Sequence, residues 1–201
     1  MLQCASIGQN MAEAYPELPI VPNMLPLKHH WFRPRPKPGD CVKISYSPSN
    51  TNRRGFEDKG AQRTIAALKT LEERGVEVEI MTNMPLCDVL ERKGSAHIAI
   101  DECVTGGYHR ASLEGLALGC VVVNDCRKAN VERIKAMSGA PDHPFVISRI
   151  GDLLQTLEKL VALGPAKLEA MGRENRWWAE EYWNSKDLLE RCWLPFCECA
   201  Q

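Results

Sequence analysis

Two polar segments of this 201-residue chain hold residues that could bind an anion. The first, 47–60, reads SPSNTNRRGFEDKG and places Arg54 and Lys59 just before a helix-like segment. A lysine at a helix start opposes the helix dipole, which is already positive there, so its position suits a bound anion better than it suits the helix. A solvated turn with incidental charges is the alternative, and the segment alone favours neither.

The second segment, 100–119, reads IDECVTGGYHRASLEGLALG and runs through Gly106 and Gly107 into a helix that starts within 108–111. Free backbone N–H groups at a helix start can cradle a phosphate, and glycines let a ligand approach the main chain closely. Glu114, about one turn in, can either cap its own helix or accept both hydroxyls of a ribose. The candidate substrate-binding residues are Gly107, Tyr108, His109, Ser112 and Glu114.

Other chemistries at the second segment are weaker. Asp101 and Glu102 with His109 could form a metal site, but adjacent carboxylates on a strand point in opposite directions and the set is short of ligands. Cys103 with His109 could form a nucleophile and base, but no third group to orient the base is evident. The dinucleotide, P-loop and nucleophile-elbow motifs are absent, which disfavours a dehydrogenase, a P-loop NTPase and an α/β-hydrolase.

Both segments lie within a repeating pattern of short apolar runs, each followed by a helix-like stretch. Five runs share this character: VKISYS at 42, VEVEIM at 76, HIAI at 97, CVVV at 120 and FVI at 145. Strand-then-helix repetition predicts a parallel sheet covered by helices, and hence a three-layer, Rossmann-like α/β domain. Ligands bind outside the carboxyl ends of the strands in such sheets, which is where the two polar segments fall.

The two ends of the chain depart from this pattern. Residues 1–40 hold more than half of the 13 prolines, which predicts an extended arm or interdomain-type linker before a domain over 41–201. A long C-terminal helix is expected to carry an aromatic face. Because one helix seldom covers so many indoles, we expect the tail to form a homo-oligomer or to bind a partner chain. The tail tryptophans are Trp177, Trp178, Trp183 and Trp193.

Composition sets broad limits. A net charge of −1 creates no field that would draw the chain to nucleic acid or anionic lipid. No apolar run is long enough to span a membrane and the first residues lack the layout of a signal peptide, so the expected location is the cytoplasm. The nine cysteines are odd in number and scattered, which disfavours a disulfide framework. Cys192, Cys197 and Cys199 lack a fourth ligand for a metal clip.

The order of these motifs resembles the C-terminal, donor-binding half of GT-B glycosyltransferases of the group 1, or family 4, type. The resemblance rests on Arg54-x(4)-Lys59-Gly60, a strand ending in Asp101, and G-x-Y-x(3)-S-L-E-G-L-A-L-G before an apolar strand. It implies that Arg54 and Lys59 contact the donor diphosphate and serve catalysis, and that Glu114 contacts the ribose. The first glutamate of the family's E-x(7)-E pattern would fall at Gly106, so its contact with the donor sugar does not carry over.

The sequence therefore predicts an enzyme, the donor domain of a glycosyltransferase that transfers sugar from a nucleotide-diphosphate sugar to an acceptor. The departing diphosphate needs either a divalent cation or fixed cations with helix N–H groups, and the residues present supply the second set, so no metal cofactor is expected. The family's N-terminal acceptor domain has no counterpart in the sequence. The alternatives are a non-catalytic nucleotide-sugar-binding module and an interaction domain that needs a partner chain.

Overall fold

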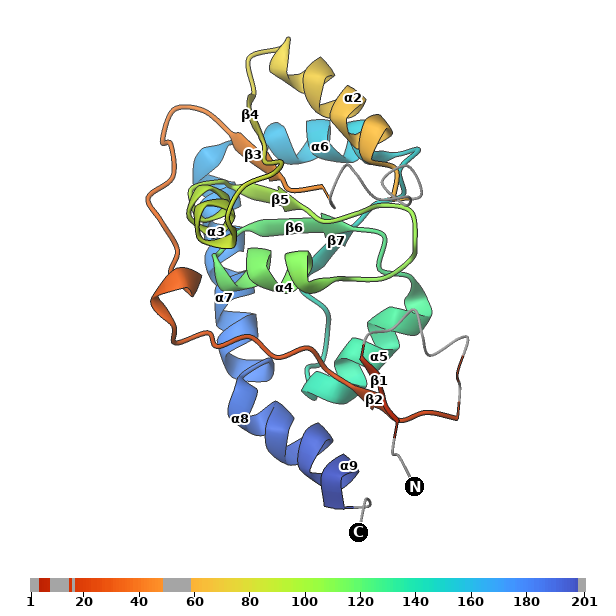
Figure 1. Cartoon of the computed structure of the whole chain (residues 1–201). Coiled ribbons are helices and arrows are strands. Elements are labelled where there is room, and N and C mark those ends of the chain that lie inside the picture. Colours follow the sequence, from red (N-terminus) through yellow and green to blue (C-terminus); the bar gives the residue numbers. More distant parts are fainter. Residues whose placement is uncertain (1–3, 8–14, 16, 49–58, 199–201) are drawn as a thin grey trace.

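The centre of the molecule is a five-stranded parallel sheet (Figure 1). The computed structural model describes residues 4–7, 15, 17–48 and 59–198. The strand order is β4-β3-β5-β6-β7, and every neighbouring pair is parallel. All five predicted strands are present, so the predicted α/β class is confirmed. The strands are β3 (Lys43–Tyr46), β4 (Glu77–Ile80), β5 (Ile98–Ile100), β6 (Val121–Asn124) and β7 (Phe145–Ile147).

Helices follow the strands in the expected alternation, and α7 continues into a helical tail. No helix within the described residues has the length and apolar character needed to cross a bilayer. The helices of the domain are α2 (Ala61–Glu72), α3 (Leu86–Gly94), α4 (Arg110–Ala117), α5 (Lys128–Ser138), α6 (Leu153–Val161) and α7 (Pro165–Tyr182). The tail consists of α8 (Ser185–Leu188), the π-helix η2 (Leu189–Trp193) and α9 (Leu194–Glu198).

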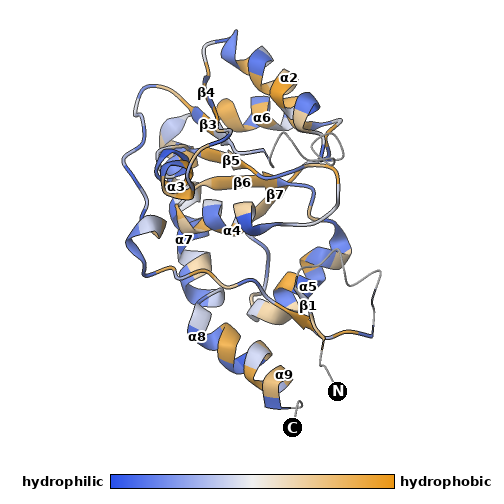
Figure 2. Ribbon diagram, viewed as in Figure 1, coloured by the Kyte–Doolittle hydropathy of each residue, from blue (hydrophilic) through white to orange (hydrophobic). Residues whose placement is uncertain are grey.

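Both faces of the sheet are apolar, which explains the three layers. On β5, Ile98 packs with the buried residues of α2 and α6, whereas its neighbour Ala99 packs with those of α3 and α4. The same alternation separates Val121 from Val122 on β6, because successive side chains of a strand point to opposite faces. Figure 2 shows these strands as a hydrophobic layer between helices that are hydrophilic on their outer sides.

The chain reverses its direction of travel across the sheet at β3. It leaves β3 through α2 to β4 at one edge, then returns through α3 to β5 on the other side of β3. In open α/β sheets, such a topological switch point opens a crevice outside the carboxyl ends of the two strands, and ligands bind there. The loops that leave β3 and β5 are the two polar segments singled out in the sequence.

The proline-rich arm lies across the domain. It contains two short paired strands, β1 (Ser6–Ile7) and β2 (Ile20–Val21), and the 3₁₀ helix η1 (His30–Phe32). Leu25 and Phe32 are buried in the same hydrophobic cluster as α4 and Trp178. The guanidinium of Arg176 on α7 donates to the carbonyls of Leu27 and Phe32 in the arm and to that of Ala117 on α4. Arm, α4 and α7 are therefore held together at one point.

The arm also covers most of the tail tryptophans. Trp183 is 1% exposed and donates its indole N–H to the carbonyl of Asn23 at 3.0 Å, and Trp193 donates to Pro22 at 3.1 Å. Trp178 is buried as well, whereas Trp177 is 57% exposed. The premise that one helix leaves these indoles uncovered is therefore wrong for Trp178 and Trp183. Association with a partner chain stays a prediction, which the exposed Trp177 supports.

A close contact between two glycines sets the distance of α7 from the turn after α4. A Cβ atom at Gly172 would lie 2.0 Å from the carbonyl oxygen of Gly119. We expect Gly172→Ala to lower the free energy of unfolding by about 3 kcal/mol, because α7 must move away from its neighbours. Gly151→Ala is the matched control, since a Cβ there meets nothing within 4 Å. Equal midpoints for the two variants in urea unfolding would show that α7 tolerates displacement.

Candidate functional site

The carboxylate of Asp101, directly after β5, organises the start of α4. Its Oδ2 accepts the backbone N–H of His109 at 2.7 Å and the hydroxyl of Ser112 at 2.7 Å. The Ser112 hydroxyl in turn accepts the side-chain N–H of Asn124, at the end of β6, at 2.9 Å. The network ties β5, β6 and the first turn of α4 together, so the helix start has a fixed position at the carboxyl edge of the sheet.

The loop between Asp101 and α4 is held from within and from α5. Glu102 accepts the backbone N–H of Thr105 at 2.9 Å, and it also accepts the Thr105 hydroxyl. The carbonyl of Gly106 accepts the backbone N–H of Arg127 at 3.0 Å and the side-chain N–H of Asn130 at 2.7 Å. Together with the contacts of Asp101, these hydrogen bonds engage both carboxylates of the loop in building it.

The start of α2 approaches this loop closely and places Lys59 beside it. Gly60, the N-cap of α2, has a φ of 68°, a conformation that favours glycine. A Cβ atom there would lie 2.7 Å from Cγ2 of Val104, so only glycine allows the approach. The ammonium of Lys59, one residue earlier, is near enough to His109 to act on its pKa. Two basic groups thus stand at the start of α4.

His109 and Asp101 form a coupled pair. Nδ1 of His109 lies 3.4 Å from Oδ2 of Asp101, an ion-pair distance without hydrogen-bond geometry. Burial lowers the pKa of His109 and so does the charge of Lys59, but the contact with Asp101 outweighs both and the net shift is upward from 6.5. Burial raises the pKa of Asp101, but His109 and Ser112 outweigh burial and hold the pKa below its ordinary value.

Glu114, the predicted ribose ligand, is buried in an ion-pair cluster. One carboxylate oxygen lies 2.9 Å from Nζ of Lys93, and the other lies 3.2 Å from Nε of Arg110. The Lys93 side chain is only 2% exposed, so the charge of Glu114 is needed to compensate it. A ribose at this position would compete with two cations for the same oxygens.

The remaining predicted residues divide into four groups. Lys59, Gly107 and His109 lie where the start of α2 meets the loop before α4. The side chain of Tyr108 points away from this place, because it stacks on Phe145 and meets Trp183 edge to face in the core. Ser112 is fully buried and serves the Asp101 network. Arg54 lies outside the described residues.

Burial also decides the chemistry of Cys103. Its thiol is 1% exposed, and burial together with the neighbouring acidic groups raises its pKa far above the ordinary value. The thiol therefore stays protonated at neutral pH and cannot act as a nucleophile. The part of the chain that the structure describes contains no group of three His, Cys, Asp or Glu side chains placed to hold a metal ion.

Sequence reasoning missed two cations that shape the edge, Lys93 and Arg127. A signal for Lys93 was available, because it occurs three residues after the apolar Leu90 and so belongs to the buried face of the amphipathic helix α3. Arg127 carried no comparable signal. Its guanidinium donates to the carbonyl of Val104 at 2.8 Å and stands over Gly106, where a Cβ atom would lie 2.6 Å from its Nε.

Sequence comparison finds no matching family model and no matching curated protein. The fold, in contrast, is similar to solved glycosyltransferase structures. Sucrose-phosphate synthase from Thermosynechococcus elongatus matches 99% of this chain, with a TM-score of 0.66 and 13% identity. A glycosyltransferase from Rickettsia africae matches 96%, with a TM-score of 0.61 and 15% identity. TarM from S. aureus matches 89%, with a TM-score of 0.58 and 12% identity.

The architecture is therefore that of a Rossmann-like domain of the GT-B glycosyltransferase fold, as the sequence predicted. At these identities the similarity establishes the fold. The chain spans 59% of the matched sucrose-phosphate synthase, 61% of the Rickettsia africae protein and 39% of TarM.

The pair of His109 and Asp101 makes the site sensitive to pH. Protonated His109 stabilises the fold below pH 6.5, and this contribution is lost as the pH rises through its pKa in the folded protein. Ionised Asp101 contributes above its ordinary pKa of 3.8 and loses its contribution as the pH falls through the lowered value. We expect Asp101→Asn to lower the pKa of His109, measured by NMR titration, with the signals of His30 as the internal control. An unchanged titration would contradict the coupling.

The cluster around Glu114 predicts a structural role for this residue. Lys93→Met leaves the buried carboxylate with Arg110 as its remaining partner, so we expect a loss of about 3 kcal/mol in unfolding free energy. The double variant Lys93→Met/Glu114→Leu should recover most of the loss, because it removes both buried charges. Chemical denaturation measures both. If Lys93→Met is as stable as the parent, the pair contributes nothing to the fold.

Proposed function

We propose that this chain is the donor-binding domain of a glycosyltransferase, which binds a nucleotide-diphosphate sugar at the crevice between β3 and β5 and transfers the sugar to an acceptor. One observation carries the proposal. The loops after β3 and β5, both candidates for anion binding from their residues, leave the sheet at its topological switch point. They approach each other at Gly60 and Val104, with Lys59 near His109. The diphosphate belongs there, against Lys59, His109 and the backbone N–H groups of the helix start.

The ligand of one similar solved structure supports a nucleoside diphosphate as the ligand proposed here. The similar TarM structure was obtained with UDP bound, which makes a nucleoside diphosphate the first ligand to test. In transfer, negative charge builds on the departing diphosphate and must be stabilised. Lys59 and the N-terminus of α4 supply fixed positive charge for this purpose, and Arg54 is proposed to add a second cation from the segment outside the described residues. This arrangement needs no divalent metal.

Lys59→Ala tests the phosphate role. We expect the affinity for UDP, measured by calorimetry, to fall about tenfold or more, because a cation beside the phosphates is lost. The unfolding free energy should change by less than about 0.5 kcal/mol, since Lys59 is partly exposed and forms no ion pair with the described residues. Lys69→Ala, an exposed lysine later in α2, is the control. If Lys59→Ala binds UDP as tightly as the parent, the diphosphate does not bind beside Lys59.

Metal independence is read from the same titration. With EDTA present, UDP binding should be unchanged, because fixed groups rather than a cation hold the phosphates. A loss of binding that Mn²⁺ restores would contradict the proposed mechanism.

A non-catalytic binding module is the second candidate, and the burial of Glu114 favours it. The carboxylate proposed for the ribose is engaged by Lys93 and Arg110, so the site offers fewer groups to grip a donor. Measuring sugar transfer from UDP-, GDP- and ADP-sugars to a panel of acceptors, beside donor binding, separates the two. If the chain binds a donor but transfers no sugar, it is a binding module that needs a partner. If it neither binds a donor nor transfers sugar, it is an interaction domain.

A further inference from the structure

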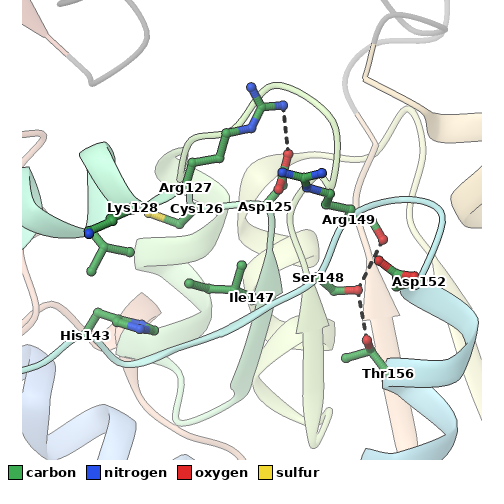
Figure 3. A pocket seen from close by; sticks show the side chains of 11 residues that line it. Asp125, Cys126, Arg127, Lys128, His143, Ile147, Ser148, Arg149, Asp152 and Thr156 are labelled. Atoms are coloured by element: carbon green, nitrogen blue, oxygen red, sulfur yellow. Dashed lines mark hydrogen bonds and ion pairs between the residues drawn. The ribbon is translucent and has the colours of Figure 1, made fainter.

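A second hollow lies further along the carboxyl edge, where β6 and β7 end (Figure 3). It is an open hollow of about 780 Å³, formed by the loop after β6, the first turns of α5, the loop before β7, the end of β7 with the loop that follows it, and the start of α6. A volume of this size is typical of pockets for small organic ligands and far exceeds that of an inorganic ion.

Basic side chains from three separate segments line this pocket. Arg127 and Lys128 come from the start of α5, His143 from the loop before β7, and Arg149 from the loop after it. Asp125 is paired with Arg127 at 3.2 Å. Within the described residues neither Lys128 nor Arg149 forms an ion pair. Besides Asp125, the lining contains one further carboxylate, that of Asp152. The pocket therefore has an excess of positive charge.

The hydrogen-bonding groups of the pocket are oriented. Nδ1 of His143 accepts the backbone N–H of Phe145 at 3.2 Å, so the neutral ring carries its proton on Nε2, which lies 4.0 Å from a carboxylate oxygen of Asp142. The N-cap of α5 is Arg127, whose side chain makes no cap hydrogen bond and so does not offset the positive end of the helix dipole. This dipole adds to the attraction for an anionic group.

The opposite part of the lining suits a sugar ring. Ile147 is 43% exposed and Val131 also lines the pocket, so part of the wall is apolar and the C–H face of a ring could pack there. Asp152 and Thr156 provide groups that can bond hydroxyls. We propose that this pocket binds a monosaccharide that carries a phosphate or carboxylate group, with the anion against Lys128 and Arg149.

Arg127 lies between this pocket and the loop after β5. Its guanidinium lies against Gly106 on one side and lines the pocket on the other. A ligand in the pocket thus sits on the same edge of the sheet as the proposed donor. That this ligand is the second substrate of the transfer depends on the proposed function, whereas its binding to the pocket does not.

Calorimetry on the full chain tests the proposal with four probes. Glucose 6-phosphate and glucuronate represent the phosphate and the carboxylate, and glucose and inorganic phosphate represent the separate halves of such a ligand. We expect one of the two anionic sugars to bind at least about tenfold more tightly than either glucose or inorganic phosphate. Arg149→Ala should weaken that binding about tenfold or more, while Arg63→Ala, an exposed arginine on α2 outside the pocket, should leave it unchanged.

The outcomes distinguish this site from the proposed donor site. Lys59→Ala should leave the binding of the anionic sugar unchanged, and Arg149→Ala should leave UDP binding unchanged. If UDP does not bind while the anionic sugar does, the donor site is wrong and this pocket stands. The proposal is overturned if neither anionic sugar binds, if Arg149→Ala binds as tightly as the parent, or if inorganic phosphate alone binds as tightly as the anionic sugar.

Discussion

The hydrogen bonds of one buried carboxylate, that of Asp101, hold the functional edge of this molecule together. They join the end of β5 to the first turn of α4 and, through Ser112, to Asn124 at the end of β6. A helix start attracts an anion only if its N–H groups keep a fixed direction, and here that direction is set by the sheet. Lys59 and His109 act at a place that Asp101 defines.

Acidic residues near the same edge hold the main chain in place or compensate a buried charge. Asp101 and Glu102 bind main-chain N–H groups of their own loop, and Glu114 compensates the buried Lys93. Around the start of α4, the charges that remain beside this loop, those of Lys59 and His109, are therefore basic. This division accounts for a locally basic place on a chain whose net charge is close to zero.

The order and type of the elements could be predicted, because strand and helix periodicity are local properties of the sequence. The position of the two polar loops at the carboxyl edge followed from the parallel sheet. The fate of individual side chains did not follow, because it depends on contacts between distant segments. Tyr108 turns into the core to meet Phe145 and Trp183, and Glu114 meets Lys93 from another helix. The prediction of uncovered indoles was wrong for Trp178 and Trp183, because nothing local indicates that the arm folds back over the tail.

The contact between the two ends of the chain constrains the order of events during synthesis. Trp183 donates to Asn23, and Arg176 donates to Leu27 and Phe32, so the arm is separated from its partners by most of the polypeptide. The strands and their connecting helices can pair as they leave the ribosome, but the arm must wait until α7 has followed. The apolar side chains of Leu25 and Phe32 share one hydrophobic cluster with Trp178 and Trp183, so this cluster is complete only once α7 has formed. The fold therefore depends on contacts of long sequence separation, which form slowly during folding.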